Sequence, residues 1–117
     1  MLVDYIELEQ ELHPICYPTA AFAEFEKRAG ITALEFIEQL ETGRVSFTHL
    51  THLVAAGLNS GARKTKTGKI FSSEDAGDMF GLMDIPKLMP ILSAYMSTKT
   101  TDPETEKNDQ GATLPEA

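Results

Sequence analysis

Two histidines near the middle of the chain have the spacing of a metal-binding pair. His49 and His52 are three positions apart, so both imidazoles would lie on one side of a helix. A catalytic zinc takes about three protein ligands. The Glu-x-x-His segments of di-iron sites have a Glu where this chain has Ser46. We therefore interpret both histidines as polar helix residues, and we expect neither a metal site nor a cofactor.

Four cations are concentrated in residues 61–69, together with two glycines and two threonines. They are Arg63, Lys64, Lys66 and Lys69. The spacing of the glycines does not match a phosphate-binding loop, and Ile70 stands where such a loop has Ser or Thr. The composition is instead typical of a surface loop, which we expect to be mobile.

These cations have two candidate partners, an acidic protein surface and nucleic acid. Acids outnumber bases on both sides of them, by nine to three in residues 1–60 and by four to one in residues 70–97. A surface on which bases could stack is missing, because Phe71 is the only adjacent aromatic residue and we expect it to serve the core. We favour an acidic protein surface or plain solvation. A small nucleic-acid-binding regulator that uses residues 61–69 remains the alternative.

The sequence has no recognisable catalytic constellation. Glu35, Glu38 and Glu41 recur at the spacing of a solvated helix face, whereas acid and base catalysis needs two groups with contrasting environments. Cys16 is the single cysteine and has no nucleophile motif around it. We therefore predict that the protein is not an enzyme, and that it folds by packing alone, as in reducing cytoplasm.

Length and charge limit the class of partner. The chain has 117 residues, of which 42% are hydrophobic, which is enough for one core. A net charge of −8 disfavours general binding to nucleic acid or to anionic membranes. We find no secretory signal pattern and no window with the ~18 apolar residues of a membrane span. A protein partner is therefore expected.

The elements that would position these residues begin with a strand pair. Residues 2–8 and 12–17 are apolar runs joined through the polar residues 9–11, which predicts a hairpin. Pro14 weakens this prediction because it lacks an N–H for the ladder. The first run has its apolar residues at the parity of one strand face: Leu2, Ile6 and Leu8.

Three amphipathic helices are predicted after the hairpin. The first begins at Thr19 and ends at Gly30, a left-handed cap. Thr32 and Glu35 form the capping box of the second, and Ser46 starts the third. The residues expected on their buried faces are Phe22, Phe25 and Ala29, then Leu34, Ile37 and Leu40, then Leu50, Leu53, Val54 and Leu58.

Two further helices are expected beyond residue 70. Ser72 or Ser73 caps the first, and Asp84 starts the second, which Pro90 should kink or delay. The fold class is therefore mainly α (α+β), a short N-terminal β-hairpin followed by about five short α-helices. We expect one domain over residues 1–97 and a disordered acidic tail over residues 98–117.

Two stretches follow the strand pair and precede a final apolar helix and a charged tail. They are "TAAFAEFEKRAGITALEFIEQLETGRVSFTHLTHLVAAGL" and "SSEDAGDMF". This order resembles the tail assembly chaperones of long-tailed (siphovirus-like) bacteriophages and prophages, over residues 2–97. The resemblance implies a non-enzymatic protein of the bacterial host cytoplasm, not retained in the mature virion. Such proteins bind the tape measure protein, assist assembly of the tail tube protein and tend to self-associate.

A partner-binding surface is expected on the cations and on the methionines near the C-terminal helices. Methionine side chains adapt to different partners, although they also fill small cores. The candidate residues are Arg63, Lys64, Lys66, Lys69, Met79, Met83 and Met89.

Overall fold

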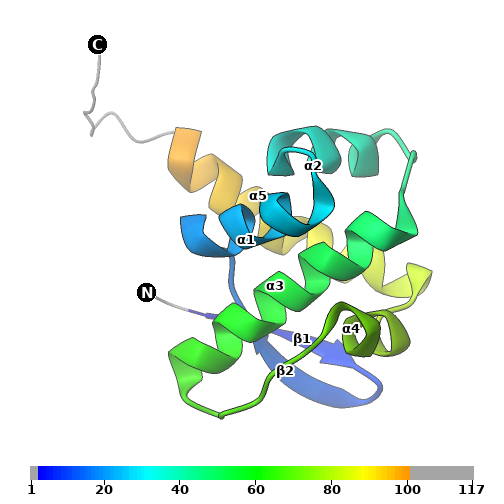
Figure 1. Ribbon diagram of the computed structural model, residues 1–117. Coiled ribbons are helices and arrows are strands. Elements are labelled where there is room, and N and C mark those ends of the chain that lie inside the picture. The colour runs from blue at the N-terminus through cyan, green and yellow to red at the C-terminus, as the bar shows by residue number, and fades with distance from the viewer. Residues whose placement is uncertain (1–2, 101–117) are drawn as a thin grey trace. The chain divides into compact units, whose positions relative to one another are not determined.

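The structure is a computed structural model that describes residues 3–100 (Figure 1). Its elements, in chain order, are β1 (Asp4–Leu8), β2 (Glu11–Ile15), α1 (Thr19–Ala29), α2 (Ala33–Glu41), α3 (Phe47–Thr65), α4 (Ser73–Met79), the 3-10 helix η1 (Leu82–Asp84) and α5 (Ile85–Thr100). The predicted layout, a hairpin followed by five α-helices, is confirmed. The chain divides into two compact units, residues 1–87 and 88–117.

The hairpin turns through two residues without a glycine. Glu9 and Gln10 have φ values of 54° and 66°, so both are left-handed, as a tight two-residue hairpin turn requires. Leu8 pairs with Glu11 across this turn, and pairing continues to Ile15 opposite Asp4, with Pro14 opposite Tyr5. Because hydrogen-bonded and non-bonded pairs alternate from the turn, Pro14 falls in a non-bonded pair and its missing N–H costs the ladder nothing.

The alternation predicted for the first strand holds where the structure describes it. Ile6 and Leu8 are buried, whereas Leu2 lies outside the described residues. Leu12, in the second apolar run, is exposed on the opposite face from the buried Ile15. One face of the hairpin therefore belongs to the core.

Helix α1 begins and ends, and helix α2 begins, where the sequence predicts. Gly30 closes α1 with φ 79°, and the Oγ1 atom of Thr32 accepts a hydrogen bond of 3.0 Å from the N–H of Glu35. A carboxylate of α1 adds a second cap, since Glu26 Oε2 accepts from the N–H of Ala33 at 2.8 Å. The prediction that Leu34 is buried is wrong, because it is 62% exposed. The buried face of α2 is instead Ala33, Phe36, Ile37 and Leu40.

Helix α3 is the central element of the first unit, where it contacts β2, α1 and α4 (Figure 1). Ser46 caps it, and all four of its predicted core residues are buried. The helix continues to Thr65, so the prediction of a loop over residues 61–69 is wrong for its first five residues. Arg63 and Lys64 lie in the last helical turn, and Lys66 is the left-handed C-terminal cap.

Two glycines bring the backbone of α3 against the end of the hairpin. A Cβ atom on Gly61 would overlap the Pro14 carbonyl, and one on Gly57 would overlap the Tyr17 ring. The Cys16 N–H donates a hydrogen bond of 3.2 Å to the Gly57 carbonyl. Gly61 therefore does not end the helix; it permits close contact between helix and strand.

Helix α5 begins at Ile85 and crosses the boundary between the two units. Pro90 lies inside it, so this proline does not delay the start of the helix. The helix also includes residues 98–100, the first part of the predicted tail. Residues 101–117 lie outside the described residues, and the division into a domain of residues 1–97 and a tail stays a prediction.

Candidate partner-binding surface

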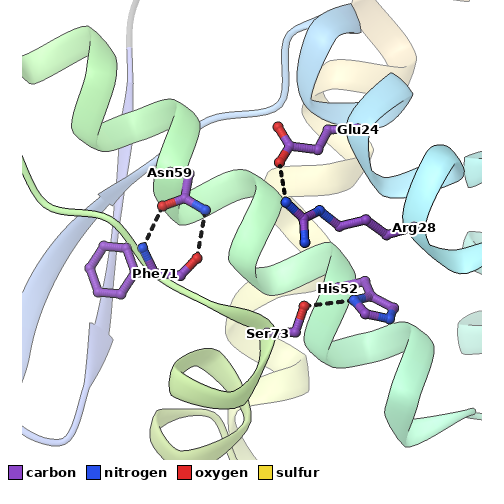
Figure 2. Close-up of polar contacts among 6 residues, drawn as sticks. All are labelled: Glu24, Arg28, His52, Asn59, Phe71 and Ser73. Carbon is purple, nitrogen blue, oxygen red and sulfur yellow. Dashed lines mark hydrogen bonds and ion pairs between the residues drawn. The ribbon is translucent and has the colours of Figure 1, made fainter.

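Side-chain hydrogen bonds hold the linker before α4, residues 67–72, against α3, as Figure 2 shows. The Asn59 amide makes two of them to the Phe71 backbone: Nδ2 donates to the carbonyl at 2.7 Å, and Oδ1 accepts from the N–H at 2.6 Å. About two turns earlier along α3, His52 Nδ1 lies 2.6 Å from Ser73 Oγ at the start of α4. The linker and the first residue of α4 are therefore both tied to α3.

Helix α4 is short but well capped. Ser72 Oγ accepts from the Asp75 N–H at 2.9 Å, and Asp75 Oδ2 accepts from the Ser72 N–H at 3.1 Å, which completes a capping box. A Cβ atom on Gly77 would lie 3.0 Å from Thr51 Cγ2, so this glycine sits close to α3. Caps, ties and close packing together fix α4 beside the first half of α3.

A small apolar groove lies between α3, α4 and η1. Its volume is about 200 Å³. It is lined by Thr51, Gly77 and Gly81 and by six apolar residues, namely Phe47, Leu50, Val54, Ala76, Phe80 and Leu82. Leu50, Val54 and Ala76 are buried, whereas Phe47 and Leu82 are 62% and 60% exposed. Exposed apolar side chains beside a groove are typical of a protein-binding surface.

A second, more open hollow of about 450 Å³ also borders α4. Its lining combines charged and apolar side chains, namely Lys69, Ile70, Phe71, Asp75, Asp78 and Met79. Ile70 is largely exposed there. This hollow brings together two residues of the predicted site, Lys69 and Met79, from different segments.

The other predicted site residues are distributed over both units. Met83 is 83% exposed in η1, beside the groove residue Leu82. Arg63 and Lys64 are exposed at the end of α3, followed by the exposed cap Lys66. Met89 lies in α5 within the second unit. The structure therefore places Met83 beside the groove and the first cations on a helix end.

The basic segment, residues 61–69, is not uniformly positive. Lys69 Nζ lies 3.8 Å from Glu11 Oε2 of the hairpin, which offsets part of its charge. This geometry suits the predicted contact with an acidic protein surface less well than four unpaired cations would. Binding of nucleic acid through residues 61–69 stays an alternative prediction.

Sequence reasoning missed the groove. The predicted buried faces and site residues include neither Phe47, which directly follows the cap Ser46, nor Leu82. The signal that could have found them is a large apolar residue next to a cap or a glycine, as in Ser46-Phe47 and Gly81-Leu82.

The side chains of His49 and His52 have different neighbours. His52 is bonded to Ser73, whereas the ring of His49 packs edge-on against Phe36 with centroids 5.8 Å apart. Burial lowers the pKa of His52, and the charges of Arg28 and His49 lower it further. Among residues 3–100, no three side chains of His, Cys, Asp or Glu are grouped as a metal site would need.

Asp84 fixes the backbone at the start of α5. Burial raises the pKa of its carboxyl group, but the Gly81 N–H and the Lys87 ammonium outweigh this effect and lower it. The Gly81 N–H donates to Oδ2 at 2.9 Å, and Lys87 Nζ lies 3.0 Å from Oδ1. The Lys87 ammonium also donates to the Glu7 carbonyl at 2.9 Å, which ties this corner to β1. Asp84 therefore holds Gly81 at the edge of the groove.

Within the described part of the chain, no helix is both long and apolar enough to cross a membrane. Comparison with known protein families, curated proteins and solved structures gave no match.

Proposed function

We propose that the protein is a tail assembly chaperone of a long-tailed bacteriophage or prophage, which binds the tape measure protein and assists assembly of the tail tube. The observation that carries the proposal is the order of elements, a hairpin followed by five helices. Caps at Gly30, Thr32, Ser46 and Ser72 delimit these helices, in the stretches on which the resemblance rests.

The apolar groove supports a binding function. A tape measure protein has long helical and apolar segments, which expose hydrophobic surface before the tail tube encloses them. A groove between helices can cover the apolar side chains of such a segment through contacts repeated at each helical turn. In this proposal the protein is a binder and not an enzyme, and it acts in the host cytoplasm, with self-association and contact with the tube protein as further parts of its role.

Co-expression with the tape measure protein of the same tail gene cluster tests the proposal. We expect the chaperone to increase the soluble fraction of that protein and to co-purify with it. The control is an unrelated helical protein of similar size and net charge, which should do neither. The proposal is wrong if the tape measure protein stays as insoluble as in the control and the two proteins separate during purification.

A further inference from the structure

We propose that the groove between α3 and α4 binds the apolar face of an amphipathic helix whose neighbouring side chains are Lys or Arg. The groove residues named above form the site, with Phe47 and Leu82 exposed at its edge. The inference rests on the proposed function in one respect, that this helix belongs to the tape measure protein. The chemistry of the binding helix follows from the groove itself.

The size and lining of the groove favour side chains over a small molecule. A volume of about 200 Å³ is below the range of roughly 300–1,000 Å³ that is usual for small-molecule sites. Most of its lining is apolar, and Leu50, Val54 and Ala76 are buried. A site with so few polar groups cannot orient a polar metabolite, but it can bury apolar side chains of a polypeptide.

The spacing of the groove residues on α3 favours a helix as the occupant. Phe47, Leu50 and Val54 stand at positions i, i+3 and i+7. They therefore follow one face of α3 for about 10 Å, or two turns. A partner helix repeats its apolar side chains over the same distance, so two or three of its anchors can contact this stretch.

Charge favours basic residues beside those anchors. Helix α4 contains three acids and no Lys or Arg, and the charge of Asp84 in η1 is paired with Lys87. Glu74 and Asp78 are exposed on α4. A second copy of the chain, with a net charge of −8, would bring like charges together at this surface. A basic amphipathic helix is complementary to it in both shape and charge.

Gly81 offers a way to fill the groove. Its φ of −105° is open to any residue, and a Cβ atom there would come no closer than 3.8 Å to another group, Asp84 Oδ2. We therefore expect Gly81→Leu to fold and to place its side chain where the partner would bind. Ala23→Leu, at an exposed position of α1, is the matched control because it adds the same side chain elsewhere.

The test is titration of the ¹⁵N-labelled full chain with designed 18-residue helical peptides. One has a leucine face flanked by lysines, and a second replaces every lysine with glutamate. We expect the lysine peptide to shift the amide signals of Gly77 and Gly81, and to bind Ala23→Leu as it binds the unmodified protein. The glutamate peptide, and the lysine peptide with Gly81→Leu, should each bind at least about ten-fold more weakly.

Three results would overturn the inference. In the first, Gly81→Leu binds the lysine peptide as tightly as Ala23→Leu does. In the second, the glutamate peptide binds as tightly as the lysine peptide. In the third, the unmodified protein is a dimer, Gly81→Leu dissociates this dimer and the lysine peptide does not dissociate it, which makes the groove a self-association site. If Gly81→Leu unfolds, as circular dichroism will show, the exposed-edge pair Phe47→Ser and Leu82→Ser replaces it.

The peptide test is independent of the tape measure protein. If the lysine peptide binds in the groove but the tape measure protein does not co-purify, the proposed function is wrong and the groove inference stands. If the tape measure protein co-purifies equally with Gly81→Leu and with the unmodified chain, the function stands and the groove is not its site.

Discussion

Gly61 carries more of the fold than its small size suggests, because the hairpin backbone occupies the space where a side chain would lie. Alanine normally stabilises a helix by about 1 kcal/mol relative to glycine. At this position we expect the opposite sign: Gly61→Ala should lower the free energy of unfolding by about 2–3 kcal/mol, since the Pro14 carbonyl belongs to the backbone and cannot move aside. Urea denaturation of the variant measures this change.

The sign of the change in the free energy of unfolding distinguishes helix propensity from steric overlap with the hairpin. If Gly61→Ala is more stable than the unmodified protein, helix propensity dominates and the close contact between α3 and β2 is wrong. Gly57→Ala should also destabilise, but by less, because it meets the Tyr17 side chain rather than backbone.

His52 should make stability depend on pH. Burial and the charges of Arg28 and His49 lower its pKa in the folded protein below the ordinary value of 6.5. As the pH falls through that value, the unfolded chain takes up a proton before the folded protein does, so the free energy of unfolding falls. His52→Gln removes this contribution, and its stability should therefore decrease less than that of the unmodified protein between about pH 7.5 and pH 5.5.

The measurement is chemical denaturation at several pH values for both proteins. The other titrating groups contribute to both curves, so the difference between the curves isolates His52. Parallel curves over the whole interval would mean that the pKa of His52 is the same in the folded and unfolded states.

Among the elements, the hairpin turn is a place where substitutions should increase stability. Glu9 and Gln10 hold left-handed conformations, which cost non-glycine residues about 1–2 kcal/mol each. Asn-Gly is the preferred pair for this turn. We expect Glu9→Asn with Gln10→Gly to raise the free energy of unfolding by about 1–2 kcal/mol, measured by thermal and urea denaturation.

Gln10→Gly alone should give part of that gain. A double variant that is no more stable than the unmodified protein would show that the turn is not under strain.

The ends of the elements were the most predictable part of the fold. A capping residue acts on backbone groups within its own turn, so Gly30, Thr32 and Ser46 are predictable without knowing the partner of each helix. For α4 the sequence leaves Ser72 and Ser73 open, and Ser72 is the cap. The buried face of α2 was less predictable, because both Ala33 and Leu34 fit a helical repeat with Ile37. The repeat that includes Phe36 is the buried one, and Leu34 is left exposed.

The end of α3 could not be predicted from local signals. Gly61 followed by several cations is typical of a helix end or a loop. The structure continues the helix because the hairpin packs against its glycines, a contact between residues distant in the sequence. For the same reason the local sequence predicts a loop at Arg63 and Lys64, although they lie on the last turn of the helix.

Partner binding by the predicted site residues stays a prediction, but three of these residues lie at surface hollows. Lys69 and Met79 line one hollow and Met83 lies beside the groove, because exposure of polar and flexible residues can be judged from composition. The groove itself depends on how α4 packs on α3 through Asn59 and Gly77, which no local pattern specifies.

Salt should stabilise the whole molecule. The net charge of −8 implies repulsion within the folded chain, and salt screens exposed charges beyond about 10 Å. The ion pairs among the described residues include Arg28–Glu24 at 3.2 Å and Lys69–Glu11 at 3.8 Å, both exposed enough to contribute little. We expect a rise in melting temperature between about 20 mM and 500 mM sodium chloride, equivalent to about 1 kcal/mol.

Calorimetry in sodium chloride measures this rise, and sodium sulfate at equal ionic strength separates screening from effects of the anion. A fall in melting temperature with sodium chloride would mean that ion pairs outweigh the repulsion.

The contact between the hairpin and α3 also constrains how the protein forms during translation. Cys16 Sγ donates to Ser60 Oγ at 3.4 Å and Tyr17 OH donates to the Leu53 carbonyl at 2.9 Å, so residues 44 and 36 positions apart must meet. At a synthesis rate of about 5–20 residues per second, the hairpin waits roughly 2–9 seconds for the helix that covers it. During that interval the nascent chain has an unburied apolar strand surface of its own.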